Sequence, residues 1–513
     1  MAVFSVLGTA AGLYMNRHGV NVEPDSSVYM TSGILFAHGE GLSMPNSIGA
    51  PQPMAWFPPV TPWMVSFCEW TGQDIFKSFG IFNAVSWGLL IGWVGWLAKR
   101  SAGGLLIPGI LGAAAILTSG DLCNVHSYLY SEPPFFLCLM GALSALAFWW
   151  EQPRLRWVAV AGLCIGLGVL TRYVGLTLIA TGGLVLLAHP GRDWRRIRAL
   201  ILFGVLSVGP ILGWHFWITR ARGSAASERT LAWHPITQAQ INEGIETIAS
   251  FVVPVDFANS VWAPRIVFLL MAGLAAALIR IWLGRPDGRT RREKLGATPP
   301  LIGISACFIA IYLAFLVLSI SIADACTPLD GRILSIIVPP GVLVVTYLVS
   351  VSLYQPGEKW TRRGTACATA GLLAILGYST LNENVCREHL YWTPGQDSEV
   401  HDALRSVPSR DIVFSNAPCD LFMATRRKTE ALPLLPPEYG QNGSEEEDFR
   451  KRFAFMEKTL APHGGWVVYW EALANDPAIT MEALRAALPV IETKTFGDGT
   501  LLHIAPFSGK KKP

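Results

Sequence analysis

The chain has 513 residues, of which 51% are hydrophobic and only 15% are charged. A soluble protein needs about 25% charged residues to cover its surface, so the composition excludes a string of soluble domains. The formal net charge of +3 points to no nucleic-acid partner. Nine cysteines form no CxxC pair and no His/Cys cluster, which argues against a structural zinc site.

The chain contains many apolar stretches up to Leu381. Most have the length of a membrane span, and a few are somewhat shorter. A transmembrane helix needs about 20 apolar residues. Ten stretches fit, of which the second, fourth and fifth are short: Ile75–Leu97, Leu105–Thr118, Pro133–Trp150, Trp157–Thr171, Tyr173–Ala188, Ala199–Thr219, Ile266–Trp282, Leu301–Ile322, Ile333–Leu353 and Cys367–Leu381. An eleventh, Ala2–Met15, would be about 21 Å long as a helix and lacks the basic start of a signal peptide. We interpret it as the end of a first span.

The distribution of Lys and Arg predicts the orientation. With the N-terminus inside, the inner connections hold 17 Lys and Arg residues, and the outer ones before the C-terminal segment hold far fewer. The positive-inside rule requires this asymmetry. It places two long loops, Asn16–Asp74 and Arg220–Pro264, outside together with the C-terminal segment. We expect a multi-pass protein of a bacterial inner (plasma) membrane.

The apolar stretches stop near Asn384, and short alternating elements follow. Four segments predict strands and two predict helices: Asp411–Asn416, Trp466–Trp470, Pro489–Thr495 and Leu501–Ala505, then Glu445–Leu460 and Ile479–Leu488. The expected fold class is therefore mainly α. It has a bundle of about 11 spans over residues 1–383, followed by a small extracytoplasmic α/β domain over residues 384–513.

The first outer loop carries a candidate carboxylate. Its periodic stretch Ser26–His38 predicts a surface helix, and an extended Pro-rich run with Pro58 and Pro59 follows. Asp25 precedes the helix, where an acidic residue is a good N-cap. The functional alternative is a general base held at the membrane surface.

The second outer loop ends in another acidic residue, Glu132, at the start of a span. Ionisable groups at such boundaries are often functional, but Ser131-Glu132-Pro133 is also a good helix start. The loop contains four further polar or aromatic candidates: Asp121, His126, Tyr128 and Tyr130. For His126 the alternative is a solvated side chain.

Two arginines lie on the outer side, where positive charge is scarce. Arg172 separates two apolar stretches, and Arg332 begins another. They either extend toward lipid headgroups or bind a phosphate, because the planar guanidinium pairs with two oxygens at once. Acidic groups and arginines on one face of a bundle are what sugar transfer from a lipid phosphate requires: a base for the acceptor hydroxyl, and cations for the departing phosphate.

The order of these motifs adds a family resemblance. The first loop has an Asp, a Tyr four residues on, a Gly-rich step and a Pro-Pro-x-x-Pro run, namely Asp25, Tyr29, Gly39 with Gly41, and Pro58-Pro59 with Pro62. Later motifs are Ser131-Glu132, Leu170-Thr171-Arg172-Tyr173-Val174-Gly175, and Arg332-Ile333-Leu334 before Pro339-Pro340. Over most of residues 1–350 this resembles the GT-C superfamily, in particular its protein O-mannosyltransferases and lipid A aminoarabinose transferases. Phe414-Ser415-Asn416-Ala417-Pro418 and Thr425-Arg426-Arg427 look like the outer domain of such enzymes.

The resemblance implies an inverting glycosyltransferase that moves a sugar from a polyprenyl-phosphate donor to a hydroxyl of a protein, lipid or glycan acceptor. Asp25 would be the base and Glu132 would orient the acceptor or the sugar. Arg172 and Arg332 would bind the donor phosphate. The substrate cavity would be lined by Tyr29, Pro58, Pro59, Asp121, His126, Tyr128 and Tyr130. No cofactor is implied. The sequence has no Asp-x-Asp motif, which fits a donor with a single phosphate, and a divalent metal stays open.

Two alternatives remain, a transporter and a membrane ligase or polymerase of lipid-linked glycans. Transporters are often built from repeats with ionisable residues near the midplane, whereas most charges here lie at span ends. One side hypothesis concerns Cys386 and Cys419, which both fall in the outer segment, where a disulfide can persist.

Overall fold

The computed structural model describes most of the chain and forms two compact units. The described residues are 1–45, 52–189, 194–222, 233–251, 299–323, 327–354, 398–433, 444–470 and 479–508, with isolated positions between 262 and 269 and between 371 and 381. The first unit comprises residues 1–20, 57–60 and 74–390. The second comprises residues 21–56, 61–73 and 391–513.

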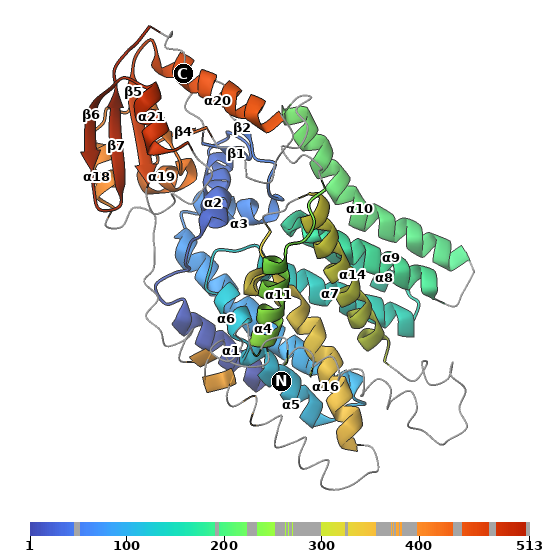
Figure 1. Cartoon of the computed structure of the whole chain (residues 1–513). Coiled ribbons are helices and arrows are strands. Elements are labelled where there is room, and N and C mark those ends of the chain that lie inside the picture. The colour runs from blue at the N-terminus through green and yellow to red at the C-terminus, as the bar shows by residue number, and fades with distance from the viewer. Residues whose placement is uncertain are drawn as a thin grey trace. The chain divides into compact units, whose positions relative to one another are not determined.

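The first unit consists of helices (Figure 1). They are α1 (Ala2–Met15), α4 (Ile75–Ser101), α5 (Leu106–Leu117), α6 (Gly120–Val125), α7 (Glu132–Glu151), α8 (Leu155–Thr171), η1 (Tyr173–Gly175), α9 (Leu176–Ala188), α10 (Trp194–Arg222), α11 (Gln238–Ser250), α14 (Pro300–Ile322), α15 (Gly331–Leu334), η3 (Ser335–Ile337) and α16 (Val338–Tyr354). Helix α7 packs against α4, α8 and α14.

Five helical segments of the described chain are long and apolar enough to cross a membrane. They are Ile75–Ser101, Glu132–Glu151, Trp194–Ala221, Pro300–Ile322 and Gly331–Val351, and each overlaps a predicted span. Helices α1, α5 and α8 and the segment Tyr173–Ala188 are apolar but shorter, as their sequences predict. Most residues of the predicted spans Ile266–Trp282 and Cys367–Leu381 lie outside the described residues. The predicted total of about 11 spans stays a prediction.

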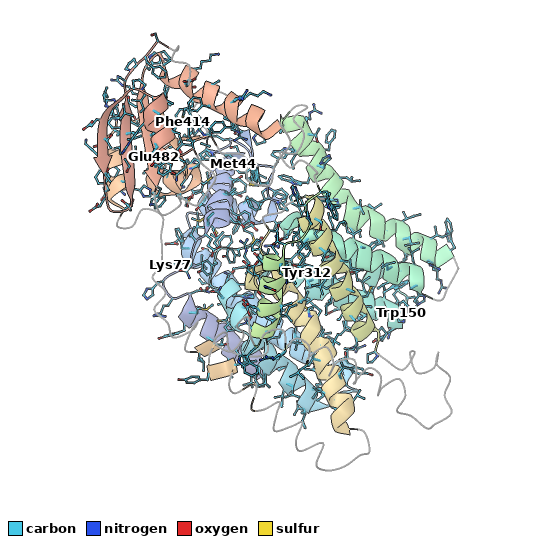
Figure 2. All side chains as sticks on the ribbon, viewed as in Figure 1. Met44, Lys77, Trp150, Tyr312, Phe414 and Glu482 are labelled. Carbon is cyan, nitrogen blue, oxygen red and sulfur yellow. The ribbon has the colours of Figure 1, made fainter. Side chains whose placement is uncertain are left out.

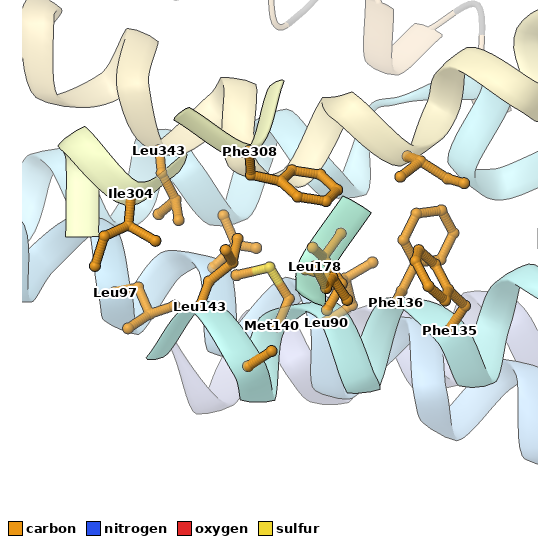
Figure 3. Close-up of a cluster of buried hydrophobic side chains, with 14 of the residues drawn as sticks. Leu90, Leu97, Phe135, Phe136, Met140, Leu143, Leu178, Ile304, Phe308 and Leu343 are labelled. Atoms are coloured by element: carbon orange, nitrogen blue, oxygen red, sulfur yellow. The ribbon is translucent and has the colours of Figure 1, made fainter. Parts of the chain in front are cut away.

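The core of the first unit is an apolar cluster in which α7 is central (Figure 3). Its side chains come from helices far apart in sequence and include Leu90, Leu97, Phe135, Phe136, Met140, Leu143, Leu178, Ile304, Phe308 and Leu343. Figure 2 labels Tyr312 of α14, which is 1% exposed in the same cluster. Because α7 is buried nearly all round, polar groups at its ends must find partners on its neighbours.

Small residues let α1 approach α4 closely. A methyl group added at Gly88 would lie 2.0 Å from Oγ1 of Thr9 and 2.6 Å from the carbonyl oxygen of Ser5. Ser5 Oγ donates a hydrogen bond of 2.7 Å to the Gly88 carbonyl. Small residues and hydroxyl hydrogen bonds are typical of helix contacts within membranes.

The second unit combines parts of the first loop with the C-terminal part of the chain. Its elements are α2 (Pro24–Ala37), β1 (Ser43–Met44), β2 (Gln52–Pro53), α3 (Val60–Trp70, except its first residue), α18 (Glu399–Arg405), β3 (Val413–Ser415), α19 (Pro418–Thr425), β4 (Glu430–Ala431), α20 (Ser444–Leu460), β5 (Gly465–Trp470), α21 (Met481–Ala487), β6 (Val490–Thr495) and β7 (Gly499–Ile504). All four predicted strands and both predicted C-terminal helices overlap observed elements.

The C-terminal strands form one mixed sheet in the order β4-β3-β5-β7-β6. β3 pairs in parallel with β4 and β5, whereas β7 is antiparallel to β5 and β6. Alternate side chains face opposite sides, as strand geometry requires. Phe414, labelled in Figure 2, and Val467 pack with α20 and α21, whereas Val413 and Val468 pack with α18 and α19. The sheet therefore has apolar helix contacts on both faces.

Helix α2, from the first loop, packs against α19 within the second unit. Ser27 Oγ donates to a carboxylate oxygen of Asp420, and Thr31 Oγ1 donates to the Cys419 carbonyl at 3.3 Å. Spatial packing thus groups this part of the loop with C-terminal elements. The predicted boundary between residues 383 and 384 falls in residues 382–397, outside the described parts.

Candidate functional site

The site in the first unit is centred on Glu132, the first residue of α7. Pro133 and Pro134 follow, and proline in the first helical turn costs little because those N–H groups have no helical acceptor. The sequence therefore starts a helix at Glu132, and its carboxylate lies near the positive end of the helix dipole. The side chain is 0% exposed. A carboxylate buried this completely requires cationic partners.

Arg172 and Arg332 both bind Glu132 through the same oxygen, Oε1. Arg332 Nε donates a hydrogen bond of 2.6 Å, and Arg172 Nη1 pairs with Oε1 and donates to Ser131 Oγ at 2.9 Å. The two arginine side chains are 15% and 18% exposed. The alternative of arginines extended toward lipid headgroups is therefore wrong for these side-chain positions. Two guanidinium groups therefore share one buried carboxylate oxygen.

Arg172 is presented by a break between two helices. α8 ends at Thr171, Arg172 is extended with φ −149° and ψ 135°, and η1 begins at Tyr173. Gly175 permits this tight return, because a methyl group there would lie 2.7 Å from the Val169 backbone nitrogen. The sequence Arg-Tyr-Val-Gly thus turns the chain and leaves Arg172 beside the start of α7.

Arg332 is presented by a short helix that is held at both ends. Asp330 caps α15 by accepting a hydrogen bond of 2.8 Å from the Ile333 N–H. Tyr312 of α14 donates a hydrogen bond of 2.6 Å to the Ile333 carbonyl. Because these bonds fix the backbone of Ile333, the residue that follows Arg332, they help to hold the Arg332 guanidinium at Glu132.

Helix α11, from the second long loop, holds the residue before this cap. Thr247 Oγ1 donates to the Leu329 carbonyl at 2.8 Å, and Glu243 Oε2 accepts from the Leu329 N–H at 3.2 Å. Gly244 lies between them and lets Leu329 approach, since a methyl group there would be 3.1 Å from its Cδ1. Sequence reasoning missed Glu243 and Thr247. The available signal was the capping box Thr237–Gln240, which marks the start of an ordered helix.

Asp121 lies against the backbone of α15. A methyl group on Gly331 would be 2.0 Å from Asp121 Oδ1, so only glycine permits this approach. Burial, together with the nearby charge of Asp330, raises the pKa of Asp121 from 3.8 to about 6. This carboxylate therefore titrates near neutral pH beside the segment that carries Arg332.

Two of the predicted cavity residues lie beside the arginine pair. The Arg332 guanidinium carbon is 4.0 Å from the Tyr130 ring centroid, a cation–π distance. Tyr130 in turn stacks on Tyr128, with centroids 5.0 Å apart and 11° between the ring planes. Aromatic rings and guanidinium groups thus share one surface of the site.

His126 is a core side chain. It is 0% exposed and lies between Trp87 and Phe136, with ring centroids at 6.3 and 5.8 Å. Its Nδ1 is 2.6 Å from the Leu122 carbonyl, and burial lowers its pKa from 6.5 to about 4. The alternative of a solvated histidine is wrong. Its predicted place in a substrate cavity stays a prediction, one that complete burial does not favour.

Asp25 and Tyr29 belong to the second unit. Helix α2 begins at Pro24 and its N-cap residue is Glu23, whose backbone N–H donates to Ser26 Oγ at 3.1 Å. The alternative that Asp25 is the N-cap is therefore wrong. Asp25 is half-buried in the first turn.

Asp25 lies on a different face of α2 from Ser27, and both faces carry buried side chains, since Tyr29 is 2% exposed. Asp25 and Tyr29 are one turn apart and share a face, about 200° around the helix from Ser27, which contacts α19. Pro58 and Pro59 are buried just before α3. The roles predicted for Asp25, Tyr29 and the two prolines stay predictions.

Two remaining predictions concern sulfur and metal. Cys419 is a buried free thiol, and Cys386 lies outside the described residues, so the structure does not support a bridge between them. Within the described ranges, no group of three or more His, Cys, Asp or Glu side chains is arranged to hold a metal ion.

No protein-family model and no curated protein sequence matches the chain. Solved structures do match. ArnT from Cupriavidus metallidurans, bound to undecaprenyl phosphate, superposes with a TM-score of 0.57 at 14% identity, over 99% of each chain. The oligosaccharyltransferase AglB from Archaeoglobus fulgidus, bound to an inhibitory peptide and a dolichol-phosphate, gives 0.51 at 10% identity, over 91% of this chain and 69% of that one.

A third structure, the mycobacterial arabinofuranosyltransferase AftD, gives a TM-score of 0.53 at 12% identity, over 99% of this chain and 41% of that one. All three are membrane glycosyltransferases of the GT-C type. The chain therefore has the GT-C fold, as the sequence resemblance predicted. The fold and the five long apolar helices make it an integral membrane protein.

Proposed function

We propose that the protein is a glycosyltransferase that moves a sugar from a polyprenyl-phosphate donor to an acceptor hydroxyl. One observation carries the proposal: two guanidinium groups meet at one buried carboxylate at a helix end. Arginine is suited to such a place because its planar group pairs with two phosphate oxygens. Two of the matched structures hold lipid phosphates, undecaprenyl phosphate in ArnT and dolichol-phosphate in AglB.

The proposed reaction is a direct displacement. The acceptor oxygen attacks the anomeric carbon, the bond from that carbon to the phosphate oxygen breaks, and the lipid phosphate leaves with the electron pair. Asp25 takes the hydroxyl proton. Attack opposite the leaving group inverts the anomeric centre. Arg172 and Arg332 stabilise the charge that grows on the departing phosphate.

Glu132 has a different proposed role from the one its sequence position predicts. Its Oε1 already accepts from both arginines and its side chain is fully buried. We therefore propose that Glu132 holds the two guanidinium groups in place, and that it does not orient the acceptor. We further propose that the reaction takes place on the outer face of a bacterial inner membrane. The excess of Lys and Arg in the opposite connections supports the choice of face.

The test is transfer by the full chain in nanodiscs, with labelled polyprenyl-phosphate sugars and an extract of candidate acceptors. Wild type should move the label to an acceptor, and Asp25→Asn should abolish transfer while expression and unfolding temperature persist. Glu23→Gln is the matched control, because a glutamine side-chain oxygen can still accept from the Ser26 backbone N–H and the Glu23 backbone N–H still donates to Ser26 Oγ. Transfer with and without EDTA reports whether a divalent metal contributes.

Two results would contradict the proposal. Full activity of Asp25→Asn would remove that residue as the base. Uptake of labelled free sugar into vesicles, without transfer from any polyprenyl-phosphate sugar, would favour the transporter instead.

A further inference from the structure

A second group of cations lies in the C-terminal part of the chain, around a cavity of about 590 Å³. The cavity lies between the loop after α18 and the segment after α19, both within the second unit. Five cationic side chains line it: Arg405, Arg410, Arg426, Arg427 and Lys428. Cavities of this size are typical of small-molecule sites.

One acidic residue, Asp411, lines the cavity among these cations. Its carboxylate is already engaged, because Trp466 Nε1 donates to Oδ2 at 3.2 Å. Positive charge therefore dominates the lining. A cavity with such a lining attracts anions and concentrates them near its surface.

Arg427 builds one wall of the cavity. Its guanidinium donates to the carbonyls of Val407, Pro408 and Asp411 at 3.0, 2.7 and 2.6 Å, which fixes the loop after α18. Its Nε is buried and has no hydrogen-bond partner among the described residues. Because Arg427 is committed to the protein backbone, the other cations are the ones available to a ligand.

The partners of those cations leave room for an anion. Arg426 is 3.9 Å from Glu69, and the Arg405–Asp402 pair is exposed on both sides. Arg410 has no ion pair among the residues that the structure describes. Lys428 is bound tightly to Glu40 at 2.5 Å. An arginine with a weak ion pair, or with none, can bind a phosphate at little cost in free energy.

The backbone conformation of Arg426 also supports a function for this residue. It has φ 56°, the left-handed conformation, and no other described non-glycine residue has a positive φ. Glycine is the usual residue at this position after a helix, since it lacks a Cβ. A strained arginine at a cavity mouth is a reason to look for a function of its side chain.

We propose that this cavity binds the phosphate group of a polar ligand such as a sugar phosphate, through Arg410, Arg426 and Arg405. Phosphate is favoured over a carboxylate-bearing apolar ligand because several arginines line the cavity and a guanidinium group can pair with two phosphate oxygens. The inference does not depend on the transfer reaction, because the site belongs to a different unit from Glu132. The phosphate comes either from a soluble sugar phosphate or from a phospholipid headgroup.

The experiment is calorimetric titration of the full chain with glucose 1-phosphate in phosphatidylcholine nanodiscs. We expect binding that weakens as salt increases. Arg410→Gln and Arg426→Gly should each weaken it at least tenfold, and Arg426→Gly relieves backbone strain, so its fold should persist. Arg485→Gln is the matched control, an exposed arginine on α21, which packs on the other face of the sheet.

A second arm repeats the titration in phosphatidylglycerol nanodiscs. Unchanged binding there identifies a soluble sugar phosphate as the source, and binding lost only there identifies the lipid headgroup. Either result supports a phosphate site. The proposal is overturned if wild type binds no glucose 1-phosphate in phosphatidylcholine, or if the two cavity variants bind as tightly as Arg485→Gln.

Discussion

The two ends of helix α7 carry the same kind of interaction in opposite surroundings. At its start, Glu132 is 0% exposed and accepts from two arginines. At its end, Glu151 is 34% exposed and pairs with Arg100 of α4 at 2.5 Å. Sequence alone shows an acidic residue at each end of one apolar stretch. The difference teaches that burial, and not the presence of an ion pair, marks the end where chemistry is expected.

The energetics of the two ends differ for a physical reason. Removing one partner of a buried pair typically costs about 3–5 kcal/mol, because a charge is left without compensation. An exposed pair contributes about 0.2–1 kcal/mol, because water solvates both partners when it breaks. Apolar residues of similar volume often stabilise a core as well as a buried ion pair does. Stability alone therefore does not require a buried Arg–Glu–Arg group, which agrees with a role in binding an anion.

The largest effect is expected from Glu132→Gln. It removes the carboxylate that Arg172 and Arg332 share, and we expect a loss of about 3–5 kcal/mol in the free energy of unfolding. Affinity for a polyprenyl phosphate should fall with it. Unfolding in detergent and lipid-phosphate binding measure the two effects. A loss no larger than that of Glu151→Gln would break the comparison between the two ends.

The next effect is a pH dependence from Asp121, beside the same end of α7. Its folded pKa is about 6, against 3.8 unfolded, so folding takes up a proton between these values. The protonated Asp121 therefore favours the folded state fully below pH 3.8, and this contribution is lost as pH rises through 6. The free energy of unfolding should fall by roughly 2–3 kcal/mol over this range. Asp121→Asn should therefore gain stability relative to wild type between pH 4.5 and 7.5. If the free energy of unfolding changes with pH in the same way in both proteins, Asp121 does not have a raised pKa in the folded state.

A smaller effect is expected where α11 holds the Arg332 segment. Thr247→Val removes the hydrogen bond to the Leu329 carbonyl at nearly constant volume, at a cost of about 1 kcal/mol. Because the segment before Arg332 is then held less firmly, affinity for polyprenyl phosphate should fall several-fold. Thr247→Ser keeps the hydroxyl and should therefore keep the affinity for polyprenyl phosphate near that of wild type. Equal lipid-phosphate affinity in the Val and Ser variants would show that α11 does not position Arg332.

The smallest effect is expected at the other end of α7. Glu151→Gln breaks an exposed pair with Arg100, whose guanidinium also lies 4.9 Å from the Phe148 ring. We expect a change of at most about 1 kcal/mol and unchanged transfer activity. Activity lost in this variant would mean that both ends of the helix contribute to function.

The sequence by itself determined the class of fold and the identity of the polar residues at the span ends. Apolar length and charge asymmetry are local properties, so they predicted α4, α7 and α14 and placed Glu132, Arg172 and Arg332 at helix ends. Short apolar segments likewise predicted the C-terminal strands, since a strand with apolar contacts on both faces has a nearly continuous apolar run.

Only the tertiary structure decided how these residues combine. Arg332 reaches Glu132 across 200 residues of sequence, and no periodicity records which ends of two helices meet. The same holds for Thr247 at Leu329, for the complete burial of His126, and for α2, whose Ser27 and Thr31 pack against α19. Side-chain pairing depends on the distances that helix packing sets, and packing is a property of the whole unit, whereas propensity and composition belong to short segments.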